Sequence, residues 1–172
     1  IMRRLTGADL FHLTREASGL PAHTIKLAVV APGDGPLDPD TLLDPDAVAT
    51  WAAEVLPRRE PFRWRLQHVP LHLGRPVWED TDTIDPAHHV MRRTLQGPDL
   101  DQALDDLIGE LAGGAPMPRD RPLWRLWVVD GLADGRVAMV LQLHHSLADG
   151  GASVRIWEEL LGADVDGPAP QG

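Results

Sequence analysis

The chain has 172 residues, of which 16 are basic and 26 are acidic, and its net charge of −10 disfavours nucleic acid as a partner because a phosphate backbone attracts a basic surface. It contains no cysteine, which excludes disulfide bonds and thiolate metal ligands. No apolar run approaches the roughly 18 residues that span a bilayer, so we expect one cytoplasmic domain and leave peripheral contact with membranes or lipid inclusions open.

Two helices and four strands are predicted in the first half of the chain. Thr6 and Asp9 have the spacing of a capping box, and Asp44 followed by Pro45 is typical of a second helix start. β-branched residues ending at Val30 favour a strand. In chain order the expected elements are a helix over 7–17, a strand over 23–30, a loop over 31–43, a helix from 45 to near Pro57, strands over 64–69 and 77–78, and a strand over 89–95.

The second half predicts a helix, a strand hairpin and a last helix. Asp99 opens a helix that Gly113 and Gly114 end. The pair Asp134-Gly135 predicts a tight turn between two strands, because both residues tolerate a positive φ. The expected elements are a helix over 100–112, strands over 123–129 and 136–143, and a helix over 152–161, followed by a Gly/Pro-rich tail or linker over 162–172.

This order of elements predicts the α/β class in a mixed α+β form. A strand hairpin and interspersed helices do not follow the strict strand-helix alternation of a doubly wound parallel sheet. We therefore expect a mixed sheet with flanking helices on one or both faces.

The densest chemistry lies where the apolar strand ending at Leu143 runs out. His144 and His145 follow directly, and a helix begins after Asp149 and two glycines. Ligands and catalytic groups gather at such strand ends, and an imidazole can take a proton from a hydroxyl near neutral pH. Asp149 can fix the loop or pair with an arginine, while Gly150 lets a substrate approach closely.

The residues alone leave other interpretations of this stretch open. Asp149 can be the N-cap of the following helix, with the histidines as ordinary polar residues of a turn. A shared metal ion is disfavoured because adjacent residues of a strand point to opposite faces. A nucleophilic Ser146 is disfavoured because an in-line hydrogen bond to the neighbouring His145 ring is awkward.

The pattern HHxxxDG from His144 to Gly150 resembles the active-site motif of the CoA-dependent acyltransferase superfamily, which includes chloramphenicol acetyltransferase and the condensation domains of peptide synthetases. Within it the chain is most similar to the bacterial wax ester synthase/diacylglycerol acyltransferases. Three further stretches carry that resemblance: 3–9, 73–78 and 120–124, of which the last holds the PLW signature Pro122, Leu123 and Trp124.

The resemblance implies roles for these residues. His145 would be the general base toward the acceptor hydroxyl, with His144 supporting its loop. Asp149 would face away from the substrate to hold an arginine, and Gly150 would keep the channel open. Pro122, Leu123 and Trp124 would support the substrate channel, although a tryptophan at a strand start is more often core.

The resemblance also implies an architecture and an activity. Residues 1–161 would be the N-terminal half of a chloramphenicol-acetyltransferase-like two-domain fold, with 162–172 leading toward a second domain. The whole protein would move a fatty acyl group from acyl-CoA, as co-substrate, to a long-chain alcohol or diacylglycerol. No bound cofactor and no metal are implied, and the C-terminal half of the fold would be the partner.

Two alternatives to this function stay open at the level of the sequence. One is transfer of an acyl group from a carrier protein, as in condensation domains. The other is a non-catalytic subunit that keeps the fold for lipid binding or assembly. A smaller question concerns the basic cluster formed by Arg58, Arg59, Arg63 and Arg65, which is either a solvated turn or an attraction site for CoA phosphates or a lipid headgroup.

Overall fold

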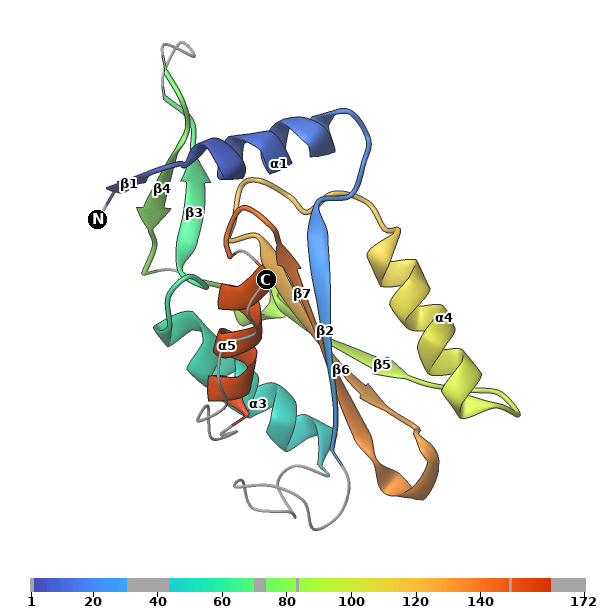
Figure 1. Cartoon of the computed structure of the whole chain (residues 1–172). Coiled ribbons are helices and arrows are strands. Elements are labelled where there is room, and N and C mark those ends of the chain that lie inside the picture. The colour runs from blue at the N-terminus through green and yellow to red at the C-terminus, as the bar shows by residue number, and fades with distance from the viewer. Residues whose placement is uncertain (1, 31–43, 70–73, 83, 149, 162–172) are drawn as a thin grey trace.

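The computed structural model describes residues 2–30, 44–69, 74–82, 84–148 and 150–161. The predicted loop over 31–43 and the predicted tail over 162–172 lie outside these residues. Within the described ranges, the strands form a three-stranded sheet of order β1-β4-β3 and a four-stranded sheet of order β2-β7-β6-β5 (Figure 1). The bounds are β1 Met2–Arg4, α1 Gly7–Ala17, β2 His23–Val30, α3 Pro45–Val55, β3 Trp64–Gln67, β4 Val77–Asp80, β5 Val90–Thr94, α4 Leu100–Ala112, β6 Trp124–Asp130, β7 Val137–His144 and α5 Gly150–Leu160.

Most predicted elements are confirmed, including their end signals. Thr6 and Asp9 form both hydrogen bonds of the capping box, and the Asp44 side chain accepts from the N–H of Asp46 at the start of α3. β6 and β7 pair as the expected antiparallel hairpin. In the turn between them Asp134 and Gly135 have φ values of 59° and 68°, the left-handed conformation that an Asp-Gly pair favours.

The strands form two sheets, whereas the prediction had one mixed sheet. The four-stranded sheet is mixed, as expected, because β5 runs parallel to β6 while β2 and β7 are antiparallel to their neighbours. The strands β1, β4 and β3 form a separate antiparallel sheet instead of joining it. The prediction missed β1, because all three of its residues are exposed and carry no apolar alternation to mark a strand.

Helices cover both faces of the four-stranded sheet, and this explains the continuous apolar run of β7. Met139, Leu141 and Leu143 pack into a core with α3 and α5, while Ala138 and Val140 pack against α4. All eight residues of β7 are buried. A strand that is covered on both sides reads as an unbroken hydrophobic run rather than an alternating one.

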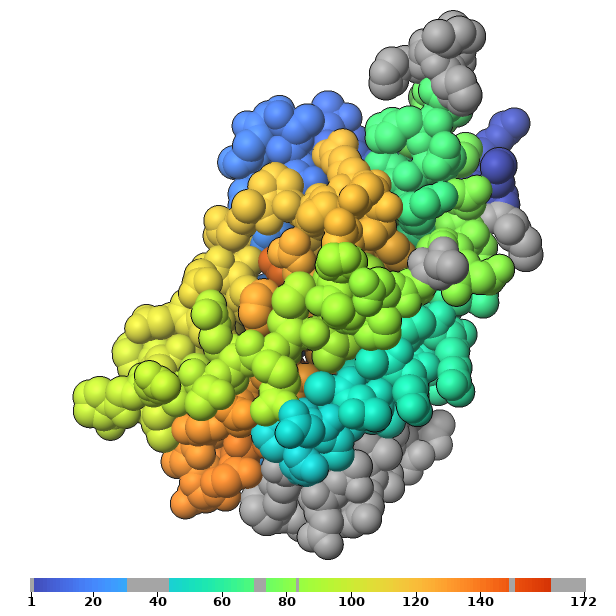
Figure 2. Space-filling model, turned by 180° about the vertical axis from the view of Figure 1, so that it is seen from behind, coloured from blue at the N-terminus to red at the C-terminus, as the bar shows by residue number. Residues whose placement is uncertain are grey.

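α1 reaches from the three-stranded sheet to the end of β2 at which β7 stops (Figure 1). Seen from behind, the segment that contains β5 fills the space between α4 and α3 (Figure 2). Its Leu95 belongs to the α4 core, and Val90 packs against the core that α3 shares. Among the described residues, no helix combines the length and the apolar character that crossing a bilayer requires.

Candidate active site

The end of β7 places the two adjacent histidines in different surroundings. The N–H of His144 donates to the carbonyl of Leu123 at 3.0 Å, and the N–H of His145 donates to the carbonyl of Ala22 at 2.8 Å. The N–H of Leu147 then donates to the carbonyl of His144 at 2.9 Å, which closes a turn. The backbone at the histidines is thus fixed to the residue before β6, to the residue before β2 and, through the turn, to itself. The predicted strand, turn and helix are confirmed, with α5 beginning at Gly150.

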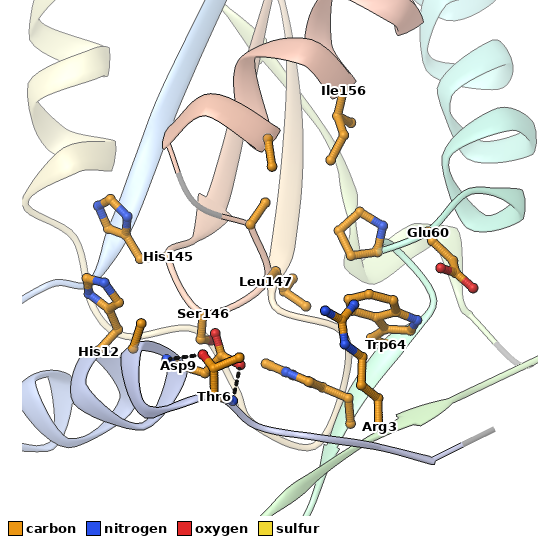
Figure 3. Close-up of a pocket in the computed structure, with 15 residues that line it drawn as sticks. Arg3, Thr6, Asp9, His12, Glu60, Trp64, His145, Ser146, Leu147 and Ile156 are labelled. Atoms are coloured by element: carbon orange, nitrogen blue, oxygen red, sulfur yellow. Dashed lines mark hydrogen bonds between the residues drawn. The ribbon is translucent and has the colours of Figure 1, made fainter. Parts of the chain in front are cut away.

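His145 lines a cavity of about 520 Å³, with its ring at one edge beside His12 (Figure 3). Its imidazole is partly buried and stacks on His12 of α1, with ring centroids 4.7 Å apart and an angle of 13° between the planes. Burial lowers the pKa of His145, and the neighbouring His12, Lys26 and Arg15 lower it further. The neutral, proton-accepting form is therefore favoured near neutral pH.

Apolar and aromatic side chains make up much of the cavity wall. Leu147, Ala148, Ala152 and Ile156 come from the turn and α5, and the rings of Trp64 and Trp78 come from the three-stranded sheet. Arg3 holds its guanidinium 4.8 Å from the centre of the Trp64 ring. The remaining wall comes from Thr6, Ala8, Asp9, Glu60, Pro61 and Ser146. This mixed composition suits a ligand with both an apolar part and a polar group, and the two imidazoles lie together at one end of the site (Figure 3).

His144 points the other way, into a fully buried polar cluster. Its Nδ1 lies 2.6 Å from Ser146 Oγ and accepts the N–H of Ser146 at 3.1 Å. Because Nδ1 accepts a backbone donor, the proton of the neutral ring is on Nε2, which faces Glu16 Oε2 at 3.5 Å. Burial, followed by the nearby charge of Arg119, lowers the pKa of His144 to about 3. The two histidines therefore do not share one site, as the strand geometry predicts.

Glu16 is a member of this cluster that the sequence reasoning missed. Its carboxylate is buried and lies 3.3 Å from a guanidinium nitrogen of Arg119, which also donates to the carbonyl of Leu13 at 2.7 Å. An acidic residue three positions after the inward-facing Leu13 is the one signal that could have found it, because it shares that face of α1.

In space, His144 lies between Ser146 and Glu16, as the histidine of a hydrolase triad lies between its serine and its acid. The surroundings of His144 oppose that chemistry. A pKa of about 3 makes His144 a weak base, so it would take the serine proton poorly. Ser146 is 4% exposed. The sequence reasoning weighed Ser146 only against His145; the structure pairs it with His144. The arrangement favours a structural network that holds the turn carrying His145.

The PLW residues lie beneath the site, outside the cavity wall. Pro122, Leu123 and Trp124 are buried, and the Trp124 indole N–H donates to the carbonyl of Phe62 at 2.8 Å. The indole also stacks on His89 with centroids 4.3 Å apart. Their connection to the site is the carbonyl of Leu123, which accepts the N–H of His144. Their support of a substrate channel stays a prediction.

Several other expected site features are placed differently or lie outside the description. Asp149 and any arginine that it holds cannot be placed, because Asp149 is outside the described residues. In the basic cluster, Arg63 pairs with Asp80 at 3.0 Å and Arg65 with Glu79 at 2.6 Å, so carboxylates occupy two of the four guanidinium groups.

Within the ranges that the structure describes, no group of three or more His, Asp or Glu side chains could hold a metal ion.

Comparisons of the sequence with a family model and with known proteins point to the same family. The model of the wax ester synthase/diacylglycerol acyltransferase catalytic domain matches residues 5–172. A protein of Mycobacterium tuberculosis named as a diacylglycerol O-acyltransferase is 36% identical over 156 residues, which cover 90% of this chain and 32% of that protein. The chain therefore spans about a third of the length of this relative.

Solved structures show the same fold. The wax ester synthase/diacylglycerol acyltransferase from Marinobacter aquaeolei VT8 superimposes with a TM-score of 0.72 and 28% identity, covering 91% of this chain and 37% of that one. The first condensation domain of the CDA synthetase has a TM-score of 0.61 and 21% identity, covering 93% of this chain and 38% of that one. The second likeness concerns the fold alone.

Proposed function

The chain belongs to the wax ester synthase/diacylglycerol acyltransferase family, and from that premise we propose that it carries the general base of an O-acyltransferase. The substrates would be a fatty acyl-CoA and the hydroxyl of a long-chain alcohol or a diacylglycerol. One observation carries the proposal: His145, whose partly buried imidazole has its pKa lowered by burial, lines a cavity with both apolar and polar walls.

The proposed reaction is a direct transfer with His145 as the proton carrier. Its neutral imidazole takes the proton of the acceptor hydroxyl while the oxygen attacks the thioester carbonyl. The tetrahedral intermediate then collapses, the C–S bond breaks, and the imidazolium returns the proton to the departing thiolate. The apolar part of the cavity wall, formed by Leu147, Ala148, Ala152 and Ile156, offers a surface against which the acyl chain or the alcohol can pack.

The second domain and the donor specificity are further parts of the proposal. The Mycobacterium tuberculosis relative described above is about three times as long as this chain, which supports a partner domain that completes the site. The hydrogen-bond donors that stabilise the oxyanion of the tetrahedral intermediate would come from that domain. A carrier-protein donor is the alternative, but the likeness to condensation domains supports only the fold.

The test is thiol release from a long-chain acyl-CoA in the presence of a fatty alcohol. The 172-residue chain, a longer natural form that contains it and the His145→Ala variant of each would be compared, with a carrier-protein thioester as a second donor. Activity that needs the acyl-CoA, the alcohol and His145 supports the proposal. Activity only with the carrier-protein donor supports the alternative. An intact fold without turnover in any form would favour lipid binding or assembly.

A further inference from the structure

A second histidine lies against the proposed base. His12 of α1 lines the same cavity as His145, and the two rings stack nearly parallel (Figure 3). The exposed ring of the neighbouring Phe11 also meets the His12 ring edge-on, with centroids 5.5 Å apart.

The contact between His12 and His145 is one of ring faces. Among the described residues, Nδ1 of His12 is buried and has no hydrogen-bond partner. With the ring centroids 4.7 Å apart, a charge on either imidazole lies directly against the other.

The other groups facing His145 are cationic or can become so. Arg15 lies on α1, and His23 and Lys26 lie on β2. Asp9 lines the cavity, but its carboxylate accepts the backbone N–H of Thr6. A proton on His12 would add another positive charge directly against the base, so the doubly protonated pair is disfavoured.

We propose that His12 is a positioning residue of the acyl-transfer site: its imidazole covers one face of the His145 ring, turns the edge of that ring toward the cavity, and opposes protonation of both rings together. This inference rests on the base role proposed for His145. Covering one face leaves the ring edge to meet the acceptor hydroxyl, which is the geometry that proton transfer needs.

The test separates stacking from charge with two substitutions. His12→Phe keeps an aromatic ring against His145 but cannot be protonated, whereas His12→Ala removes both properties. The His145 ring would be titrated by NMR in the 172-residue chain, and kcat and KM would be measured against pH in the active form. His88→Ala is the matched control, because His88 is exposed and lies outside the cavity.

The expected results differ between the two variants. His12→Phe should raise the titration midpoint of His145 by about 0.5 to 1 pH unit and move the acid limb of kcat/KM to higher pH by the same amount. Its kcat above that limb should stay within about threefold of wild type. His12→Ala should lower kcat by about tenfold with little change in KM, because the ring is no longer oriented.

The inference is overturned if His145 titrates at the same pH in wild type and His12→Phe, or if His12→Ala keeps its kcat. Failure of the base role gives a different result. If His145 is not the base, His145→Ala retains turnover, regardless of the NMR titration midpoint of His145 in the His12 variants. His12 then has no catalytic ring to position. Loss of turnover in His145→Ala together with an unshifted midpoint in His12→Phe removes the His12 inference alone.

Discussion

His144 and His145 are neighbours in the chain, yet they belong to two regions with opposite chemistry. His144 is fully buried in the cluster with Glu16 and Ser146, and burial lowers its pKa to about 3. His145 reaches a cavity, and burial lowers its pKa while leaving the ring accessible. The same physical cause thus makes one histidine an inert part of the fold and the other a candidate base. Access to a ligand, more than the pKa shift, separates the two.

The largest effect that would sharpen this contrast is on turnover. His145→Ala should lower kcat by 10²- to 10⁴-fold, the usual contribution of general-base catalysis. Its free energy of unfolding should change by less than about 1 kcal/mol, because the ring is only partly buried and gives up mainly its stack on His12. Rate assays and urea unfolding measure the two quantities. A variant that unfolds readily would place His145 with the structural residues and break the contrast.

The reverse pattern is expected for the buried cluster. Glu16→Ala removes the buried carboxylate that lies 3.5 Å from His144 Nε2 and accepts from Arg119 at 3.3 Å, so the free energy of unfolding should fall by about 2 to 4 kcal/mol. Urea unfolding near neutral pH measures the loss. Asp101→Ala serves as a control, because this carboxylate is exposed and lies 3.7 Å from its arginine partner. Equal stability of the two variants would contradict a structural role for the cluster.

The pH dependence of stability tests the environment of His144 directly. Its pKa is lower in the folded chain than the 6.5 of a free histidine, so the unfolded chain binds the proton first. Stability is therefore complete above pH 6.5 and falls as the pH drops toward 3, by about 1.4 kcal/mol per pH unit from this group. Unfolding curves at pH 7.5, 6 and 5, in wild type and in His144→Gln, should show a shallower decline in the variant. Parallel curves would mean that His144 is protonated normally.

Sequence periodicity predicted the scaffold of this contrast well. The capping box at Thr6, the Asp-Gly turn and the unbroken apolar run of β7 each follow from local chemistry, and they fix where the two histidines emerge. The separation of the rings also follows from strand geometry. The three-stranded sheet was not predicted, because β1 has only exposed residues and its pairing with β4 depends on tertiary contacts.

The partners of the two rings could not be predicted in the same way. Glu16 and His12 lie on α1, more than a hundred residues before the motif, and no local pattern links them to it. Arg119 likewise reaches Glu16 from a segment without regular structure. Such pairs arise when α1 packs across the end of β7, so only the folded arrangement identifies them.

The smallest expected effect separates a supporting serine from a nucleophile. Ser146→Ala removes the hydroxyl that lies 2.6 Å from His144 Nδ1 but keeps the backbone N–H that the same nitrogen accepts. The free energy of unfolding should therefore fall by only about 1 kcal/mol, and kcat should stay within a few-fold of wild type. A loss of turnover comparable to that of His145→Ala, with stability preserved, would mean that Ser146 attacks the thioester. That outcome would move the chemistry from the cavity imidazole to the buried one, because only His144 lies within hydrogen-bonding distance of the hydroxyl among the described residues.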